Sequence, residues 1–213
     1  MKPSNLPITL LGAGLLWFGW FGFNAGSALA ANETAAFAFT ATQLAAGAAA
    51  LSWVFAEWLI KGKPTTLGIA SGVIAGLVAV TPAAGFVSPA WATVIGLVAG
   101  VLCYGAVLAK NVIGFDDSFD VVGIHAVGGA WGSIATGLFA ANEFGGVSGL
   151  IDGNTAQLVP QVTAVVSTAA YSFVATSVLL IVVEIILGVR ATEEQEKMGL
   201  DTTVHGESGY SLS

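Results

Sequence analysis

Six long apolar stretches constrain the fold of this 213-residue chain more than any other feature. A helix needs about 20 apolar residues to cross the hydrocarbon core of a bilayer, and each stretch is roughly that long. They cover residues 7–30, 35–60, 66–86, 89–109, 119–141 and 158–189. The last stretch is long enough to tilt strongly or to protrude from the bilayer. The pattern predicts an all-α transmembrane fold with six spanning helices.

The composition supports the same fold class and excludes several functions. Hydrophobic residues make up 55% of the chain and charged residues only 9%, against about 25% charged in a soluble domain. A net charge of −7 offers no basic surface for nucleic acid. The single cysteine, Cys103, excludes an internal disulfide. With no nucleophile–base pair and no metal cluster, we expect no enzyme, no catalytic residue, no metal and no cofactor.

The positions of the basic residues predict the topology. All of them fall before the first stretch or after the second, fourth and sixth, which is one side of a six-helix chain: Lys2, Lys61, Lys63, Lys110, Arg190 and Lys197. Because cytoplasmic loops are enriched in Lys and Arg, both ends are predicted to be cytoplasmic. We expect a multi-pass protein of the cell (inner) membrane. Residues 1–189 would form the transmembrane domain and residues 190–213 a cytoplasmic tail.

His125 is the most informative ionisable residue within the predicted spans. Ionisable side chains are costly in hydrocarbon, so each suggests a function. An imidazole at this depth could relay a proton or bind a small polar solute. The alternative is a neutral histidine bonded to a neighbouring helix. A metal site is not expected, because no second His or Cys lies at ligand spacing.

Four carboxylates lie within or next to the predicted spans, and three of them have structural interpretations. Asp120 stands where the fifth helix begins, so we expect it to cap the free N–H groups there. Asp116 and Asp117 are interpreted as loop or capping residues. Glu184 lies within the sixth stretch and needs a polar partner, which the sequence does not name.

One face of the first predicted helix carries Trp20, Phe23 and Ser27, spaced three and four residues apart. Aromatic rings attract cations, and a hydroxyl accepts a hydrogen bond from an N–H donor. This face could line a narrow pore. It could equally be an aromatic belt at the membrane interface. Glycines at four-residue spacing indicate close helix packing: Gly22 and Gly26, Gly68, Gly72 and Gly76, Gly96 and Gly100, and Gly128 and Gly132.

Four separated motifs resemble the Amt/MEP/Rh ammonium transporter family, in particular its bacterial and archaeal Amt branch. They occupy residues 19–27, 72–82, 120–125 and 199–207, in the order found in that family. The resemblance implies a homotrimer with a separate pore in each subunit. A typical subunit has eleven helices, ten of them in two inverted halves. This chain resembles the second inverted repeat plus the final long helix, so we expect a fragment that lacks the N-terminal half.

The resemblance also implies roles for individual residues. Ser27 matches the hydroxyl at the outer recruitment site for ammonium. Phe23 matches a gating phenylalanine, and Trp20 an aromatic that lines the pore below it. His125 matches the second of two pore histidines that relay a proton. The tail matches a cytoplasmic segment that meets a trimeric P-II-type nitrogen-regulatory protein.

The predicted function is therefore a channel-type ammonium transporter, present here as its C-terminal half. It would conduct ammonium or ammonia through a hydrophobic pore across the lipid bilayer. One alternative is an ammonium sensor of the same fold. The other is a non-transporting half-bundle that needs its missing N-terminal half.

Overall fold

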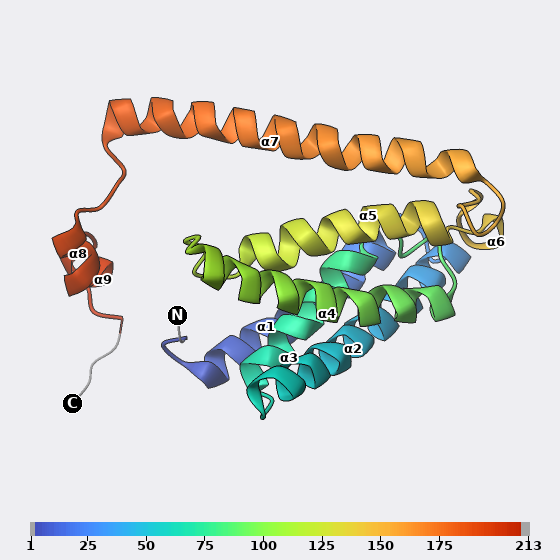
Figure 1. The fold of residues 1–213 in the computed structure, drawn as a ribbon, viewed down its shortest axis with the longest axis horizontal. Helices are drawn as coiled ribbons and strands as arrows, with labels where there is room; N and C mark the ends of the chain where they lie inside the picture. Colours follow the sequence, from blue (N-terminus) through green and yellow to red (C-terminus); the bar gives the residue numbers. More distant parts are fainter. Residues whose placement is uncertain (1–2, 210–213) are drawn as a thin grey trace. The chain divides into compact units, whose positions relative to one another are not determined.

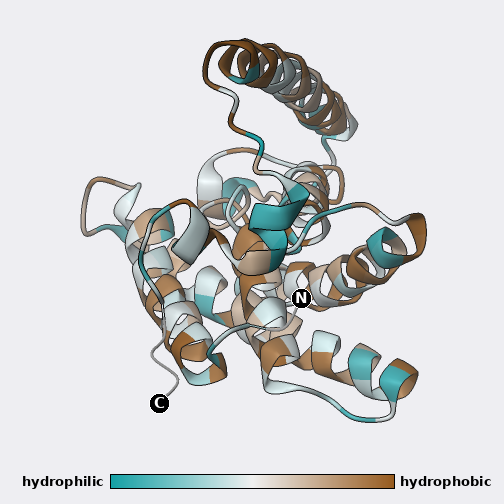
Figure 2. Ribbon diagram, turned by 90° about the vertical axis from the view of Figure 1, so that its left-hand side faces the viewer, coloured by the Kyte–Doolittle hydropathy of each residue, from teal (hydrophilic) through white to brown (hydrophobic). Residues whose placement is uncertain are grey.

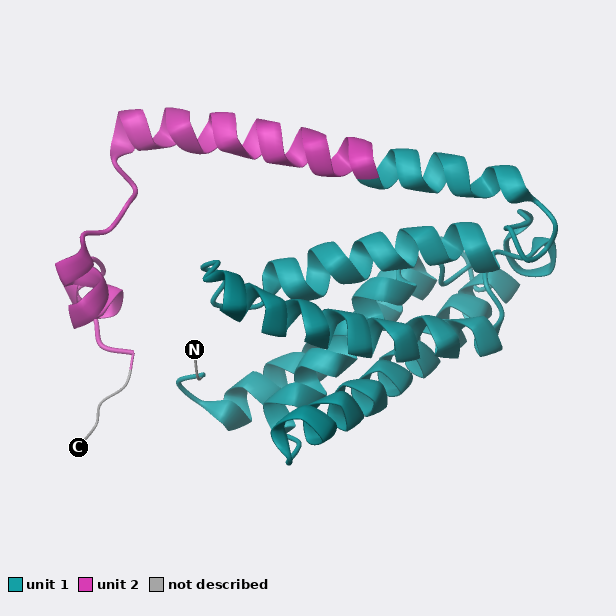
Figure 3. Ribbon diagram, viewed as in Figure 1, with its two compact units in different colours: residues 1–165 teal, residues 166–213 magenta. Residues whose placement is uncertain are grey.

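The computed structural model describes residues 3–209, and helices are the only regular elements in that range. The chain divides into two compact units, residues 1–165 and 166–213 (Figure 3). The first unit contains most of the helices. Lys2 lies outside the described residues. The all-α class predicted from the sequence is confirmed.

The helices of the first unit follow the predicted order (Figure 1). They are α1 (Leu6–Gly26), α2 (Glu33–Lys61), α3 (Thr66–Val80), α4 (Pro89–Ile113), a π-helix (Val122–Ala126), α5 (Val127–Phe139), α6 (Asn142–Gly145), a 3-10 turn (Thr155–Gln157) and the first turns of α7 (Leu158–Leu187). The loops after α2 and α4 lie at the same end of the unit as the start of α1 (Figure 1). The predicted alternation of the first segments is therefore seen.

Within residues 3–209, five helical segments are long and apolar enough to cross a membrane, whereas the apolar helix α3 is too short. This helix has 15 residues, and residues 81–86 continue as turns. Pro82 has no N–H to extend the helical hydrogen bonds. Ten of the residues of α3 are buried, so the helix lies among its neighbours. The sequence overestimated its length because an apolar run does not distinguish a helix from the buried turn after it.

Polar side chains begin four of these helices. The N-cap oxygens of Asn5, Asn32, Thr65 and Ser88 accept hydrogen bonds from backbone N–H groups in the first turns of α1, α2, α3 and α4. Each bond satisfies a donor that the helix itself leaves unpaired. Gly62 and Gly114 end α2 and α4 with positive φ angles of 79° and 78°. The helix boundaries therefore follow from local sequence.

Close packing in the core depends on residues without side chains. A Cβ atom added at Gly76 on α3 would lie 2.4 Å from the carbonyl oxygen of Ala45 on α2. One added at Gly132 on α5 would lie 2.0 Å from the carbonyl oxygen of Ala79 on α3. The packing role predicted for these glycines is confirmed. Gly22 and Gly26 on α1 differ, because no atom lies within 4 Å of a Cβ added there.

The second unit comprises the rest of α7, α8 (Glu193–Met198) and α9 (Leu200–Thr203). Apolar residues dominate α7, and hydrophilic ones occur mainly in the short helices and loops (Figure 2). Glu184 accepts hydrogen bonds from the backbone N–H groups of Val189 and Arg190, at 2.9 and 3.2 Å. The partner that the sequence could not name is therefore the backbone just beyond the end of α7.

Candidate functional site

Trp20 is held in place by a hydrogen bond to the end of α3. Its indole Nε1–H donates to Thr81 Oγ1 over 2.8 Å, and that hydroxyl donates in turn to the carbonyl oxygen of Leu77 over 2.7 Å. The hydroxyl is a donor and an acceptor at once, so both groups are satisfied. The half-buried indole ring therefore has a fixed orientation on α1. Sequence reasoning missed Thr81, although its place in an apolar stretch marked it as a polar group needing a partner.

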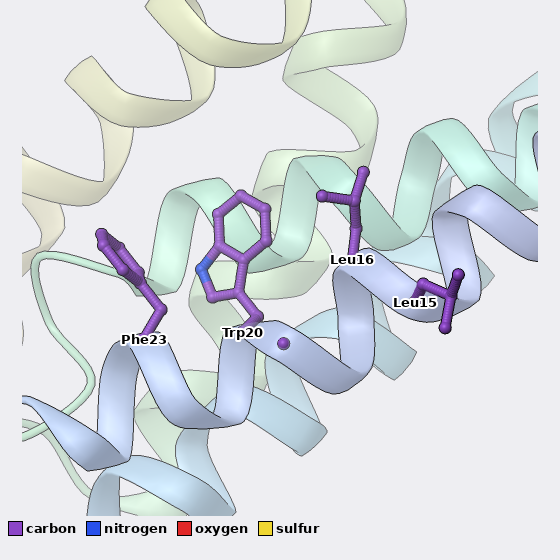
Figure 4. Close-up of a pocket in the computed structure, with 5 residues that line it drawn as sticks. Leu15, Leu16, Trp20 and Phe23 are labelled. Carbon is purple, nitrogen blue, oxygen red and sulfur yellow. The ribbon is translucent and has the colours of Figure 1, made fainter.

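Phe23 lies next to Trp20 on the exposed side of α1. The two ring centroids are 6.1 Å apart with the planes at 79°, an edge-to-face arrangement. Phe23 is 61% exposed. With Leu15, Leu16 and Gly19 the two rings line an apolar hollow of about 330 Å³ (Figure 4). Figure 4 shows Leu16, Trp20 and Phe23 on one side of the helix, and the shared side of Trp20 and Phe23 agrees with their spacing.

Ser27 follows directly at the end of α1. Its hydroxyl donates to the carbonyl oxygen of Phe23 at 2.5 Å, and the residue is exposed. Because the proton points back to the helix, the oxygen lone pairs are available to an N–H donor. The structure thus places Trp20, Phe23 and Ser27 in a row, apolar at one end and hydrogen-bonding at the other.

Contacts with α2 fix the rotation of α1. The Asn24 side-chain amide donates to the buried Thr42 hydroxyl over 2.9 Å. The rings of Phe21 and Phe39 stack with centroids 4.2 Å apart. These contacts position the row of Trp20, Phe23 and Ser27, yet neither pair could be found from the sequence, because each joins two segments whose relative rotation is not encoded locally.

His125 lies in the π-helix that precedes α5. Short π-helical turns are frequent at functional sites. The imidazole is exposed and makes no hydrogen bond or ion pair within residues 3–209. The alternative of a histidine bonded to a neighbouring helix therefore has no support in the described part of the chain. Among these residues, no hydrogen bond or ring contact joins His125 to Trp20 or Phe23.

Asp117 supplies the side-chain hydrogen bonds at the start of the π-helix. Its carboxylate accepts from the backbone N–H groups of Val121 and Val122, at 2.8 and 2.9 Å. Partial burial alone would raise the pKa of Asp117, but these N–H groups and the Lys110 ammonium together lower it below its ordinary value. The capping expected for Asp120 is therefore made by Asp117.

Asp120 instead forms an ion pair with Lys110, with a nitrogen–oxygen distance of 2.5 Å. Its φ angle is +58°, which turns the chain sharply into the π-helix. The Lys110 ammonium also donates to the backbone carbonyl of Asp117. Lys110 therefore ties the end of α4 to the segment that leads to His125.

Glu57 belongs to the corner between α2 and α3. It is 3% exposed, and its carboxylate accepts from the Thr65 backbone N–H at 3.0 Å and from the Thr65 hydroxyl. Lys61 Nζ lies 3.5 Å from it. These partners satisfy the buried charge, so Glu57 joins two helices and has no free acceptor directed at a solute.

Within residues 3–209, five helical segments of spanning length and apolar composition are typical of a multi-pass helical membrane protein. A sequence model of the Ammonium Transporter Family matches residues 1–210. The chain belongs to this family.

Relatives from a bacterium and an archaeon match nearly the whole chain. It is 51% identical over 211 residues to an ammonium transporter of Aquifex aeolicus, covering 99% of this chain and 50% of that protein. It is 50% identical over 210 residues to the ammonium transporter Amt1 of Archaeoglobus fulgidus, with 99% and 54% coverage. The chain thus spans about half the length of the curated relatives it matches.

Solved structures share the fold. Mep2 of Saccharomyces cerevisiae matches with a TM-score of 0.85 and 38% identity, over 91% of this chain and 45% of that one. A structure titled Sensor Amt Protein matches with a TM-score of 0.85 and 28% identity, over 96% of this chain and 50% of that one. A protein whose title names it a sensor therefore shares the fold of this chain.

Proposed function

We propose that this chain forms one wall of a channel that conducts ammonium or ammonia across the cell membrane. The observation that carries the proposal is the family match over residues 1–210. The relatives named ammonium transporters support it at 50–51% identity. The residues that carry the proposed function are the row of Trp20, Phe23 and Ser27, together with His125, which has no hydrogen-bond or ion-pair partner within residues 3–209.

Each of these residues has a distinct role in the proposed path. Ser27 accepts a hydrogen bond from ammonium, while the faces of Phe23 and Trp20 attract the cation. Phe23 acts as a gate at the entrance of the pore. Its ring is exposed and can therefore rotate easily. Ammonium gives up a proton, and the neutral ammonia that remains passes along the apolar hollow, because losing the charge removes the cost of placing an ion in a low-dielectric space. His125 relays the proton, since an imidazole changes protonation state near neutral pH.

The orientation and the partners are part of the proposal. Residues 1–189 form the transmembrane domain, with the basic loops on the cytoplasmic side. We infer three copies, each with its own pore. Residues 190–213 form the cytoplasmic tail, which meets a P-II-type nitrogen-regulatory protein. The capping box between Thr192 and Gln195 at the start of α8 supports a folded tail that a partner could recognise.

A chimera tests the function. Residues 1–210 would replace the matching half of the Aquifex aeolicus transporter, and ammonium-driven current would be measured in proteoliposomes. We expect current from the chimera and a loss of about a hundredfold or more in His125→Ala, because a relay group typically contributes that much. His205→Ala is the matched control, since His205 lies in the tail. Unchanged current in His125→Ala would exclude the relay.

The second candidate function is an ammonium sensor, favoured by the match to the structure titled Sensor Amt Protein. A sensor needs to bind ammonium but does not need to conduct it. The same chimera distinguishes the two. Saturable ammonium binding without current, with Ser27→Ala weakening the binding, would support the sensor.

A further inference from the structure

A second hollow lies within the first unit, where the turn after α3 meets the end of α5 and the start of α7. Its volume is about 240 Å³. Thr136, Gln157 and Gln161 contribute its polar lining, and Pro82, Phe86 and Val147 the main apolar part. These residues belong to loops and helix ends distant in sequence from the basic residues. The hollow is separate from the one lined by Trp20 and Phe23.

Backbone contacts fix the walls of this hollow. A Cβ atom at Gly137 would lie only 3.0 Å from Gln161 Cγ, so the first turn of α7 packs directly on α5. On the opposite wall, a Cβ at Gly145 would lie 2.2 Å from Phe86 Cδ1. The carbonyl oxygen of Phe86 accepts a hydrogen bond from the Ala141 N–H over 2.9 Å. The hollow is therefore preformed.

Hydrogen-bonding groups in the hollow remain available to a ligand within the described part of the chain. Within residues 3–209, neither the Gln157 nor the Gln161 side-chain amide makes a hydrogen bond. Each amide offers two donors and one acceptor. The buried Thr136 hydroxyl donates to the carbonyl oxygen of Gly132 over 2.9 Å and keeps its lone pairs free. Such a set suits a ligand rich in hydroxyl groups, which both donate and accept.

The charges around the hollow select against an anionic ligand. Among the residues that the structure describes, no charged residue lines it. The connecting segment 142–157 contains Glu143 and Asp152 but no Lys or Arg. The pKa of Asp152 is lowered by hydrogen bonds from the Ser148 hydroxyl and the Asn142 N–H, so this carboxylate stays ionised. A phosphate placed here would meet carboxylates and no cation.

Exposed apolar side chains lie close in sequence to the residues that line the hollow. Ile151, Val159 and Val162 are 58%, 67% and 47% exposed. A molecule with a polar head in the hollow could therefore lay its hydrocarbon chains on adjoining apolar surface. The volume is below the range of about 300–1,000 Å³ typical of sites for drug-sized ligands, which limits the head to about one sugar ring.

We propose that this hollow binds the uncharged, hydroxyl-rich head group of a membrane glycolipid. Gln157 and Gln161 hydrogen-bond the sugar hydroxyls, Thr136 accepts one more, and Phe86 covers the apolar side of the ring. The acyl chains follow the exposed valines at the start of α7. This site is independent of the proposed conduction path and does not rest on it.

Native mass spectrometry of the full 213-residue chain, released from detergent, tests this site. The probe is a monoglucosyl diacylglycerol, compared with phosphatidylglycerol of the same acyl chains. We expect a saturable glucolipid adduct and weaker phosphatidylglycerol binding. In Gln157→Leu/Gln161→Leu the glucolipid Kd should rise about tenfold, since two neutral hydrogen bonds are lost. Gln43→Leu, which changes an exposed glutamine on α2, is the matched control.

Three results would overturn the proposal. An unchanged glucolipid Kd in the double variant, with helix content and melting temperature preserved, would show that the amides do not bind it. Equal affinity for phosphatidylglycerol would indicate unspecific lipid contact. Competition by free glucose at concentrations comparable to the glucolipid would assign the hollow to a soluble polyol. Where the double variant fails to fold, Gln161→Ala replaces it. The loss of this amide should weaken the adduct, and an unchanged Kd in this variant overturns the proposal as well.

Discussion

At the scale of single residues, some polar side chains have hydrogen-bond or ion-pair partners on the protein, whereas others have none in the described residues. The indole of Trp20 and the carboxylates of Asp117 and Glu57 all have partners on the protein. His125 has none in the described residues. Residue type and position were enough to identify Trp20 and His125 from the sequence. The capping by Asp117 agrees with its interpretation as a loop or capping residue, whereas the ion pair of Asp120 was not predictable, because its partner Lys110 belongs to the preceding helix.

Replacing Trp20 tests the hydrogen bond that orients the pore-facing row. Trp20→Phe keeps an aromatic ring but removes the donor to Thr81. We expect a loss of about 0.5–1.5 kcal/mol in the free energy of unfolding, the usual contribution of such a bond, measured by thermal melting in detergent. Trp91→Phe is the control, since the recorded contact of Trp91 is ring stacking on Phe139. Equal losses in the two variants would contradict a specific role for this bond.

Asp117 gives a prediction with a defined pH dependence. Its folded-state pKa is lowered, so its stabilising effect is present above the pKa of the unfolded chain and is lost as the pH falls through the folded value. Asp117→Ala should cost about 1 kcal/mol at neutral pH and nothing at low pH. Hydrogen exchange of residues 117–126 would report it as faster exchange. Asp116→Ala, which removes only a 3.4 Å contact with Ser118, should leave exchange unchanged.

At the scale of elements, the sequence predicted which segments are helical but not how deeply each is buried. Hydropathy does not distinguish α3, surrounded by other helices, from α7, which has no buried residue. The π-helix at Val122–Ala126 was also unforeseen. Its residues suit an α-helix equally well, and the wider turn arises from Asp117 capping two successive N–H groups while Lys110 holds Asp120.

Glycine substitutions measure how close the helices are. Gly132→Ala adds a methyl group where only 2.0 Å separates it from the Ala79 carbonyl oxygen, so α3 and α5 must move apart. We expect a destabilisation of about 1–3 kcal/mol, typical of overpacking. Gly105→Ala on α4 meets no atom within 4 Å and should be neutral or slightly stabilising. If the two variants have the same melting temperature, the close contact of α3 with α5 is not formed in the membrane protein.

At the scale of the whole molecule, the arrangement of basic loops predicts how the protein is oriented in the membrane. Cysteine labelling can test this orientation. Cys103 is buried and the only cysteine, so Cys103→Ala gives a background free of thiols. Asp116→Cys places a thiol in the loop after α4, and Glu143→Cys places one in the short helix α6; both positions are exposed. Because the loop after α4 follows Lys110, the positive-inside rule puts it in the cytoplasm.

In intact cells a membrane-impermeant maleimide should therefore label Glu143→Cys at once and Asp116→Cys only after permeabilisation. The reverse pattern would invert the proposed direction of the pore, and labelling of both positions in intact cells would show that the loops do not lie on opposite sides of the membrane.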